Sequence, residues 1–154
     1  YARTFSASSD SLLFMGATGL GKTLLSGCIA RAVADRGYSV CYVSAGKLFS
    51  DFETEKFRLK EDGALTGEYL QTDLLIIDDL GTEMTTQFTV SALYQIVNGR
   101  LLSGKPTIVS TNLPDTELEA RYSAQIASRL LGAYTLYQFC GTDVRLLRKM
   151  ESRG

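Results

Sequence analysis

The sequence predicts an α/β fold in which helices cover both faces of a parallel sheet. Short apolar runs alternate along the 154 residues with longer segments whose apolar residues recur at helical spacing. The run Leu74–Ile77 is apolar throughout, which is typical of a central parallel strand buried on both faces. A glycine-rich loop, GATGLGKT, follows the first apolar run and precedes a helical pattern. These observations predict strands and helices that alternate within one domain.

The first part of the chain is expected to form two strands and two helices. The apolar runs Leu12–Met15 and Val40–Val43 predict the strands. A helix between them is expected to end before Gly37, a residue suited to a helix C-terminus. A second helix is expected over Ala45–Leu59. The apolar stripe of the first helix is Leu24, Leu25, Cys28, Ile29, Ala32 and Val33.

The rest of the chain continues this alternation. After the strand Leu74–Ile77, further strands are expected at Thr107–Ser110 and Tyr134–Phe139. Pro114 opens the segment between them, in which Ile126, Leu130 and Leu131 mark a helix. The long helix that precedes Thr107 is predicted from the stripe Phe88, Ala92, Leu93, Ile96, Val97 and Leu101.

Composition and charge narrow the function classes. The chain is 45% hydrophobic and 21% charged, which is typical of a soluble globular domain. Sixteen basic against seventeen acidic residues leave a net charge of −1, so any contact with nucleic acid needs a local basic patch. The sequence contains no histidine, which excludes His-based triads and His-ligated metals and leaves side chains suited to phosphoryl chemistry.

The expected location is the cytoplasm, without membrane association. No apolar stretch approaches the ~20 residues of a membrane span, and the N-terminus lacks a signal-peptide pattern. The three cysteines lie far apart in apolar segments and are expected to be buried, reduced thiols: Cys28, Cys41 and Cys140.

The loop GATGLGKT is the strongest functional signal. Its glycines, lysine and threonine form the pattern of a phosphate-binding loop, in which backbone N–H groups wrap a triphosphate. Lys22 is expected on the β- and γ-phosphates and Thr23 on Mg²⁺, while the N-terminus of the next helix favours the anion. The predicted nucleotide contacts are Gly16, Ala17, Thr18, Gly19, Leu20, Gly21, Lys22, Thr23 and Leu24.

Polar side chains end two further strands. Because ligands of open α/β sheets lie at the carboxyl ends of strands, these residues are expected beside the loop. Asp78 is expected to hold Mg²⁺, directly or through water, with helix capping as the alternative. Asp79 is favoured to orient or deprotonate the attacking water, and Glu83 is the alternative. Asn112 can hydrogen-bond the γ-phosphate and the water, or cap the next turn.

These motifs together resemble the AAA+ ATPase domain of bacterial and phage helicase loaders of the DnaC/DnaI type. The resemblance rests on GATGLGKT, LLIIDDLGTE, TIVSTNL, IASRLLG and GTDVR, and it extends from Ser11 to about Lys149. It implies a three-layer αβα P-loop NTPase with five parallel strands in the order 5-1-4-3-2 and no helical lid domain. It also implies a lead-in over residues 1–10, an ATPase core over 11–142 and a basic tail over 143–154.

The resemblance implies roles for single residues. Asp78 and Asp79 take the Walker B positions, and Asn112 takes sensor 1. Arg145 resembles the sensor 2 arginine. From the sequence alone, Arg129 is expected to be a solvated surface charge. The resemblance instead implies that Arg129 is an arginine finger, which completes the ATP site of a neighbouring subunit in a head-to-tail assembly. Many family members have Asp-Glu at the Walker B pair, so the shorter second side chain here predicts slow hydrolysis.

The implied function is ATP-dependent loading of a replicative helicase onto DNA. The helicase-binding region of the family lies N-terminal to the ATPase core and is expected outside this chain. The alternatives are an IstB-type transposition-helper ATPase and a nucleotide-gated adaptor with little turnover.

Single-stranded DNA is a further candidate partner. Basic and aromatic residues alternate over 47–60, although a helix with core aromatics and solvated lysines is favoured there. The residues are Lys47, Phe49, Phe52, Lys56, Phe57, Arg58 and Lys60.

Overall fold

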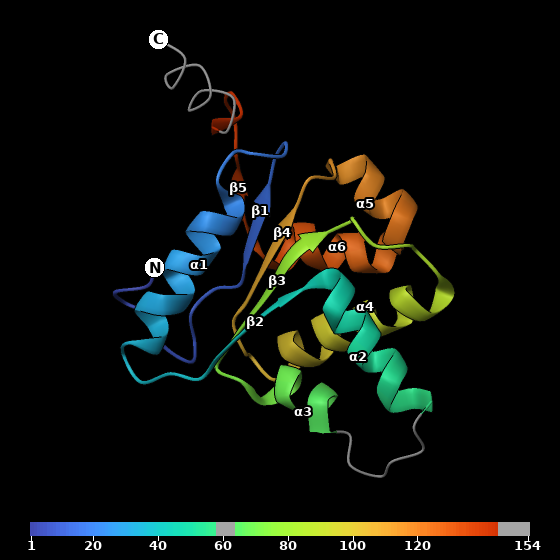
Figure 1. The fold of residues 1–154 in the computed structure, drawn as a ribbon, viewed down its shortest axis with the longest axis horizontal. Coiled ribbons are helices and arrows are strands. Elements are labelled where there is room, and N and C mark those ends of the chain that lie inside the picture. The colour runs from blue at the N-terminus through green and yellow to red at the C-terminus, as the bar shows by residue number, and fades with distance from the viewer. Residues whose placement is uncertain (58–63, 145–154) are drawn as a thin grey trace.

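The computed structural model describes residues 1–57 and 64–144. Within them a single parallel sheet of five strands lies between helices (Figure 1). Its order is β2-β3-β4-β1-β5, which confirms the expected order read from the other edge. The strands are β1 (Leu12–Met15), β2 (Val40–Ser44), β3 (Leu74–Leu80), β4 (Thr107–Thr111) and β5 (Thr135–Gln138).

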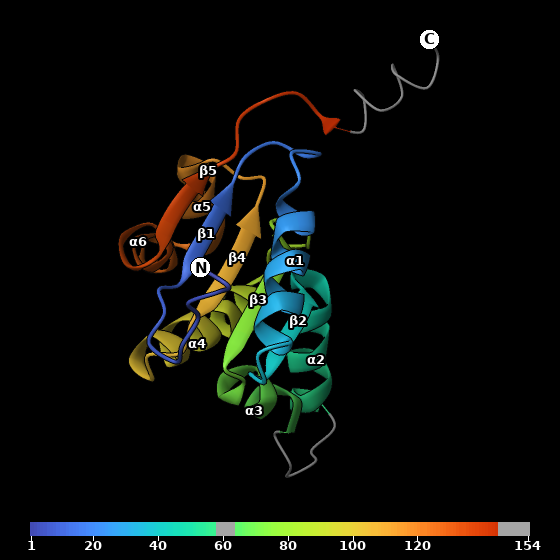
Figure 2. The ribbon, with the colours of Figure 1, turned by 90° about the vertical axis from the view of Figure 1, so that its left-hand side faces the viewer.

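Helices cover both faces of the sheet, as expected, but unequally. One face packs on α1 and on Phe5 of the N-terminal segment, while the other packs on the remaining helices (Figures 1 and 2). The helices in the described residues are α1 (Lys22–Ala34), α2 (Ala45–Phe57), α3 (Ala64–Gln71), α4 (Gln87–Leu102), α5 (Asp115–Tyr122) and α6 (Ala124–Ala133). None of them is long and apolar enough to cross a membrane.

The C-terminal end of strand β3 differs from the predicted end at Ile77. The strand continues through Asp78 and Asp79 to Leu80 instead of ending before them. Both aspartates therefore belong to a strand in the middle of the sheet, with β2 and β4 on either side. This placement brings them to the edge at which β1 also ends.

Some helical details were not expected. Helix α3 had no prediction, because its eight residues are too few to show a clear stripe. The apolar stripe of α1 is also shifted: Ile29 and Val33 are buried, whereas Leu24, Leu25 and Cys28 are exposed. Cys140 is exposed and Cys41 half-buried, so the expected burial of the cysteines is wrong, although all three are free thiols.

Arg100 joins three parts of the fold from inside the core. Its side chain is fully buried at the end of α4 and donates hydrogen bonds to carbonyl oxygens of Tyr69, Thr72 and Pro106. It also donates from Nε to the Thr107 hydroxyl at 2.8 Å. Burial lowers its pKa to about 10, so the guanidinium stays charged at neutral pH. Arg100 thus fixes the segment after α3 and the start of β4 to one helix.

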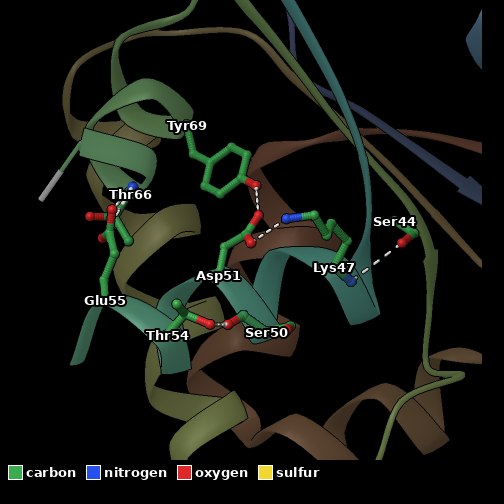
Figure 3. A network of polar contacts seen from close by, with 8 residues as sticks. All are labelled: Ser44, Lys47, Ser50, Asp51, Thr54, Glu55, Thr66 and Tyr69. Carbon is green, nitrogen blue, oxygen red and sulfur yellow. Dashed lines mark hydrogen bonds and ion pairs between the residues drawn. The ribbon is translucent and has the colours of Figure 1, made fainter. Parts of the chain in front are cut away.

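Helices α2 and α3 are joined by a buried carboxylate (Figure 3). Asp51 is 6% exposed and accepts hydrogen bonds from Lys47 and from the Tyr69 hydroxyl, the latter at 2.5 Å. One turn further along α2, the Glu55 carboxylate accepts the backbone N–H of Thr66 at 3.2 Å. Burial alone would raise the pKa of Asp51, but the bonds from Lys47 and Tyr69 lower it below its ordinary value.

The lowered pKa of Asp51 predicts a pH-dependent contribution to stability. The contribution is complete above the unfolded-state pKa of about 3.9 and is lost as the pH falls through the lower pKa of the folded protein. Asp51→Asn should therefore lower the free energy of unfolding by about 1–3 kcal/mol at pH 7. The difference from the wild type should shrink below pH 4 in urea denaturation followed by circular dichroism.

Asp35→Asn is the matched control, because Asp35 forms an exposed ion pair with Arg31 at 3.9 Å. Such a pair contributes about 0–1 kcal/mol, so its loss should change stability little at either pH. A deficit of Asp51→Asn that is the same at pH 7 and pH 3 would contradict the prediction.

Candidate functional site

The glycine-rich loop has the backbone conformation that its sequence predicts. Gly16, Gly19 and Gly21 have φ values of 148°, 82° and 91°, all in the region that favours glycine. The loop leaves the end of β1, and Gly21 is the N-cap of α1. The N-terminus of a 13-residue helix therefore points its N–H groups toward the loop, which is favourable for an anion.

Two of these glycines also lie close to the C-terminal part of the chain. A Cβ atom at Gly16 would lie 2.4 Å from the carbonyl oxygen of Phe139, and one at Gly19 would lie 2.1 Å from Asp143 Cγ. The segment after β5 runs along the loop at this point, where the Val144 N–H donates to the Gly19 carbonyl at 3.1 Å. The loop is thus shaped by the C-terminal side of the chain as well as by its own sequence.

Lys22 lies at the base of the loop. Its ammonium donates to the carbonyl oxygens of Gly16 and Ala17 at 2.5 and 2.8 Å, and the residue is 5% exposed. Burial lowers the pKa of Lys22, while the Asp79 and Asp78 carboxylates act in the opposite direction. An ammonium has three N–H donors, so the two carbonyl bonds leave one for a phosphate oxygen.

A cavity of about 640 Å³ opens above the loop. It brings together the loop, the Walker B candidate Asp79 and the sensor 1 candidate Asn112, which the sequence places far apart. Gly16, Ala17 and Leu20 belong to the same loop but do not line the cavity. The lining residues are Thr18, Gly19, Gly21, Lys22, Thr23, Leu24, Asp79, Thr82, Asn112 and Val144.

Asp78 lies beside this cavity but is buried, with 5% exposure. One carboxylate oxygen accepts the Tyr42 hydroxyl at 2.7 Å, and the other accepts the Ser110 hydroxyl. Neither partner was predicted from the sequence, because Tyr42 and Ser110 lie on different strands and have no distinguishing spacing. Each oxygen retains a further lone pair.

The oxygen donors at this site fit Mg²⁺. Thr23 lines the cavity, and Asp78 directly precedes the lining residue Asp79 on β3. Mg²⁺ usually binds one or two protein oxygens together with nucleotide phosphates and water, so the Thr23 hydroxyl and the Asp78 carboxylate are the candidates to hold it.

The structure distinguishes the two candidates for activating water. Asp79 is exposed and lines the cavity. The Glu83 carboxylate is occupied elsewhere: it accepts the Gly81 N–H at 3.0 Å and the hydroxyl of Tyr122, which is fully buried. This bond is one reason, after burial, that the pKa of Tyr122 is raised. The geometry therefore favours Asp79, and Glu83 holds the turn after β3.

Arg129 does not reach the cavity of its own chain. It lies on α6, where its Nε donates to Asn98 Oδ1 at 3.0 Å and its Nη2 donates to the Tyr94 hydroxyl at 3.2 Å. The guanidinium also covers the Tyr94 ring, with its central carbon 4.8 Å from the ring centroid. The structure of a single chain therefore does not test the expectation that Arg129 acts as an arginine finger in the ATP site of a neighbouring subunit.

Some of the predicted residues lie outside the described residues: Arg58, Lys60 and the tail from Arg145 onward. Phe49 and Phe52 are 4% and 7% exposed and pack in the core, so they cannot stack on bases. The favoured alternative for this helix, core aromatics, is confirmed for these two residues.

The chain is similar to ATP-binding proteins and to helicase loaders. The family model described as IstB-like ATP binding protein matches residues 2–137. An ATP-binding protein in an insertion sequence of Mycobacterium tuberculosis is 29% identical over 103 residues, which cover 67% of this chain and 41% of that protein. The replicative helicase loader DnaC of Escherichia coli strain K12 is 26% identical over 132 residues, which cover 84% of this chain and 54% of the loader.

The fold matches a solved helicase loader. The crystal structure of the DnaC helicase loader has a TM-score of 0.82 with this chain at 21% identity, covering 90% of this chain and 84% of the other. The curated relatives above are longer, and this chain spans about half their length. The three-layer arrangement is that of AAA+ P-loop ATPases.

A pair of glycine substitutions tests the packing of the loop. Gly16→Ala should lower the free energy of unfolding by about 1–3 kcal/mol, because the new Cβ would meet a backbone carbonyl at an unfavourable φ. Gly27→Ala should raise it by about 0.5–1 kcal/mol, because Gly27 lies inside α1 with open space around it. Urea denaturation measures both, and equal effects of the two substitutions would contradict the assignment.

Proposed function

Because the chain belongs to the family of IstB-like ATP binding proteins, we propose that it binds ATP with Mg²⁺, hydrolyses it slowly and loads a replicative helicase onto DNA. One observation carries the hydrolytic part of the proposal. A single cavity contains the phosphate-binding loop, a carboxylate at Asp79 and an amide at Asn112. Those are the groups that hold a triphosphate and orient a water molecule against it.

The reaction is water attack on the γ-phosphorus. A bond forms between the water oxygen and phosphorus, the bond to the β,γ-bridging oxygen breaks, and ADP leaves. Asp79 accepts the proton of the water or orients it, while Asn112 hydrogen-bonds the water and a γ-phosphate oxygen. Lys22 and the loop N–H groups hold the phosphates, and Mg²⁺ supplies positive charge against the developing negative charge.

Arg129 is proposed to act in the ATP site of a neighbouring subunit. It is a fixed positive charge on the surface of α6, and it lies outside its own cavity. A residue that serves a neighbour in this way requires head-to-tail contacts between subunits. ATP binding and self-association would then be coupled.

Loading of a replicative helicase is supported by similarity to DnaC over 84% of this chain. The alternative with a specific observation in its favour is a transposition helper, because another relative comes from an insertion sequence. Capture experiments with the full-length gene product should recover the host replicative helicase and not a transposase. Recovery of the transposase alone would favour the alternative.

Two substitutions separate nucleotide binding from turnover. Lys22→Ala should weaken ATP binding at least about tenfold, because phosphate loses its charged partner. Asp79→Asn should retain binding within about threefold and lower turnover by about 100-fold or more. Fluorescent-nucleotide titration and phosphate release measure the two quantities.

Glu83→Gln is the matched control, because its carboxylate contacts Gly81 and Tyr122 and not the cavity. It should keep turnover within about threefold of the wild type. If Glu83→Gln abolished turnover and Asp79→Asn did not, the assignment of the two acids would be reversed. Full helicase loading by Asp79→Asn would instead support the nucleotide-gated adaptor.

Complementation tests the role of Arg129 in a neighbour. Arg129→Ala subunits should bind ATP but turn it over at least about tenfold more slowly. Lys22→Ala subunits bind ATP at least about tenfold more weakly but still present Arg129. Mixing the two inactive variants should restore part of the activity in a concentration-dependent phosphate-release assay, and Arg31→Ala should behave as the wild type. A mixture that stays inactive would contradict action in trans.

A further inference from the structure

The register between strands β3 and β4 shifts at Asp78 and Asp79. Ile77 pairs with Val109, but the next pair is Leu80 with Thr111. Asp78 and Asp79 therefore lie together opposite the single residue Ser110, which is a β-bulge. Asp79 is in the left-handed region, with φ of 56°, a conformation that is uncommon outside glycine and that aspartate adopts more readily than most residues.

The bulge changes which side chains face the core. Leu75 and Ile77 pack into the core on the side of α2 and α4, so a regular strand would send residue 79 there as well. Instead Leu80 packs into that core, and Asp79 is exposed at the nucleotide cavity. The extra residue thus removes a carboxylate from an apolar position and turns it toward the phosphate site.

The hydroxyl of Ser110 occupies the break in the ladder. Ser110 is fully buried, and its Oγ accepts the backbone N–H of Asp79 at 3.0 Å. The same hydroxyl donates to Oδ1 of Asp78. Because a carboxylate only accepts and an N–H only donates, the direction of both hydrogen bonds is determined. One side chain therefore holds the metal-binding candidate and the backbone of the water-activating candidate.

Thr111 secures the other side of the bulge. Its buried hydroxyl donates to the Leu80 carbonyl at 2.6 Å and accepts the Leu113 N–H at 3.1 Å. Consecutive hydroxyls of β4 thus bond to consecutive residues of β3. Asn112, which lines the cavity, directly follows the end of β4.

We propose that Ser110 is a positioning residue: its hydroxyl maintains the bulge that directs the Asp79 carboxylate to the nucleotide and holds Asp78 beside it. This inference rests on the proposed hydrolysis of ATP. Without the hydroxyl, the Asp79 N–H loses its acceptor within a broken ladder, and the left-handed conformation loses its support. Asp79 then moves relative to the phosphate, and misplacement by about 1 Å lowers turnover by about 100-fold.

The test compares Ser110→Ala with one substitution that keeps the hydroxyl at this position and one that removes a different buried hydroxyl of β4. Ser110→Ala should lower kcat by about 10- to 100-fold while KM for ATP stays within about threefold, because the loop and Lys22 remain in place. Ser110→Thr keeps the hydroxyl and should recover most of kcat. Thr107→Val removes another fully buried hydroxyl of β4, the acceptor of Arg100 Nε, and should lower stability but leave kcat within about twofold.

Hydrogen exchange gives a readout that does not depend on turnover. In Ser110→Ala the Asp79 amide should exchange at least about tenfold faster by NMR, while the Ile77 amide is unchanged. If Ser110→Ala does not fold, Ser110→Cys provides a weaker hydrogen-bonding group of similar size and should show the same change in kcat and exchange.

The outcomes separate this inference from the proposed function. Faster exchange of Asp79 together with a loss confined to kcat supports the positioning role. Unchanged kcat in a folded Ser110→Ala protein, beside an active wild type, overturns it, as does equal loss in Thr107→Val. A wild type that shows no turnover above Asp79→Asn overturns the hydrolysis proposal itself, which is a different result.

Discussion

The bulge between β3 and β4 is the constraint on which the arrangement of the site depends. The carboxyl ends of parallel strands meet at one edge of the sheet, but regular pairing would point alternate side chains into the core. Because β3 has one extra residue at Asp78–Asp79, the strand stays buried while the Asp79 carboxylate is exposed at the cavity. The apolar sequence around it specifies the position of the break, because Leu80 can enter the core only if Asp79 leaves the alternation.

The phosphate-binding loop depends on distant parts of the chain in a similar way. Gly16 and Gly19 are in contact with the segment that follows β5, more than 100 residues later in the sequence. Gly16 is therefore needed for its backbone angle and also to admit the backbone of Phe139, whereas a Cβ at Gly19 would meet only the side chain of Asp143. The end of the sheet, the loop and the start of α1 form one packed unit.

Much of the fold follows from local sequence. All five strands were expected near their observed positions, and the strand Leu12–Met15 was located without error. Strands β1 and β4 are buried throughout, as their apolar composition indicates, whereas the edge strand β5 is exposed. Helix α3 was missed because it depends on contacts such as the Tyr69–Asp51 hydrogen bond, which joins residues 18 positions apart. The shifted stripe of α1 has a similar cause, since Leu24 lies against the cavity and not in the core.

The site was only partly predictable. The loop and the paired aspartates are short motifs, and the sequence analysis expected them beside one another; five of the eight loop residues and Asp79 line one cavity, whereas Asp78 is buried. The sequence favoured Asp79 but left Glu83 open, because the hydrogen bond that occupies the Glu83 carboxylate comes from a tyrosine 39 residues away. Tyr42 and Ser110 were overlooked for the same reason: their contacts with Asp78 arise from strand order and not from spacing along the chain.

The contacts of Arg129 carry an energetic consequence for assembly. Its guanidinium is satisfied by Asn98, by the Tyr94 hydroxyl and by the Tyr94 ring within its own chain. A neighbouring subunit that uses this charge has to replace those bonds, at a cost of a few kcal/mol by ordinary hydrogen-bond and cation–π strengths. In the head-to-tail assembly proposed above, subunits without a triphosphate would offer no compensating anion, and the internal contacts of Arg129 would then discourage association until nucleotide is bound.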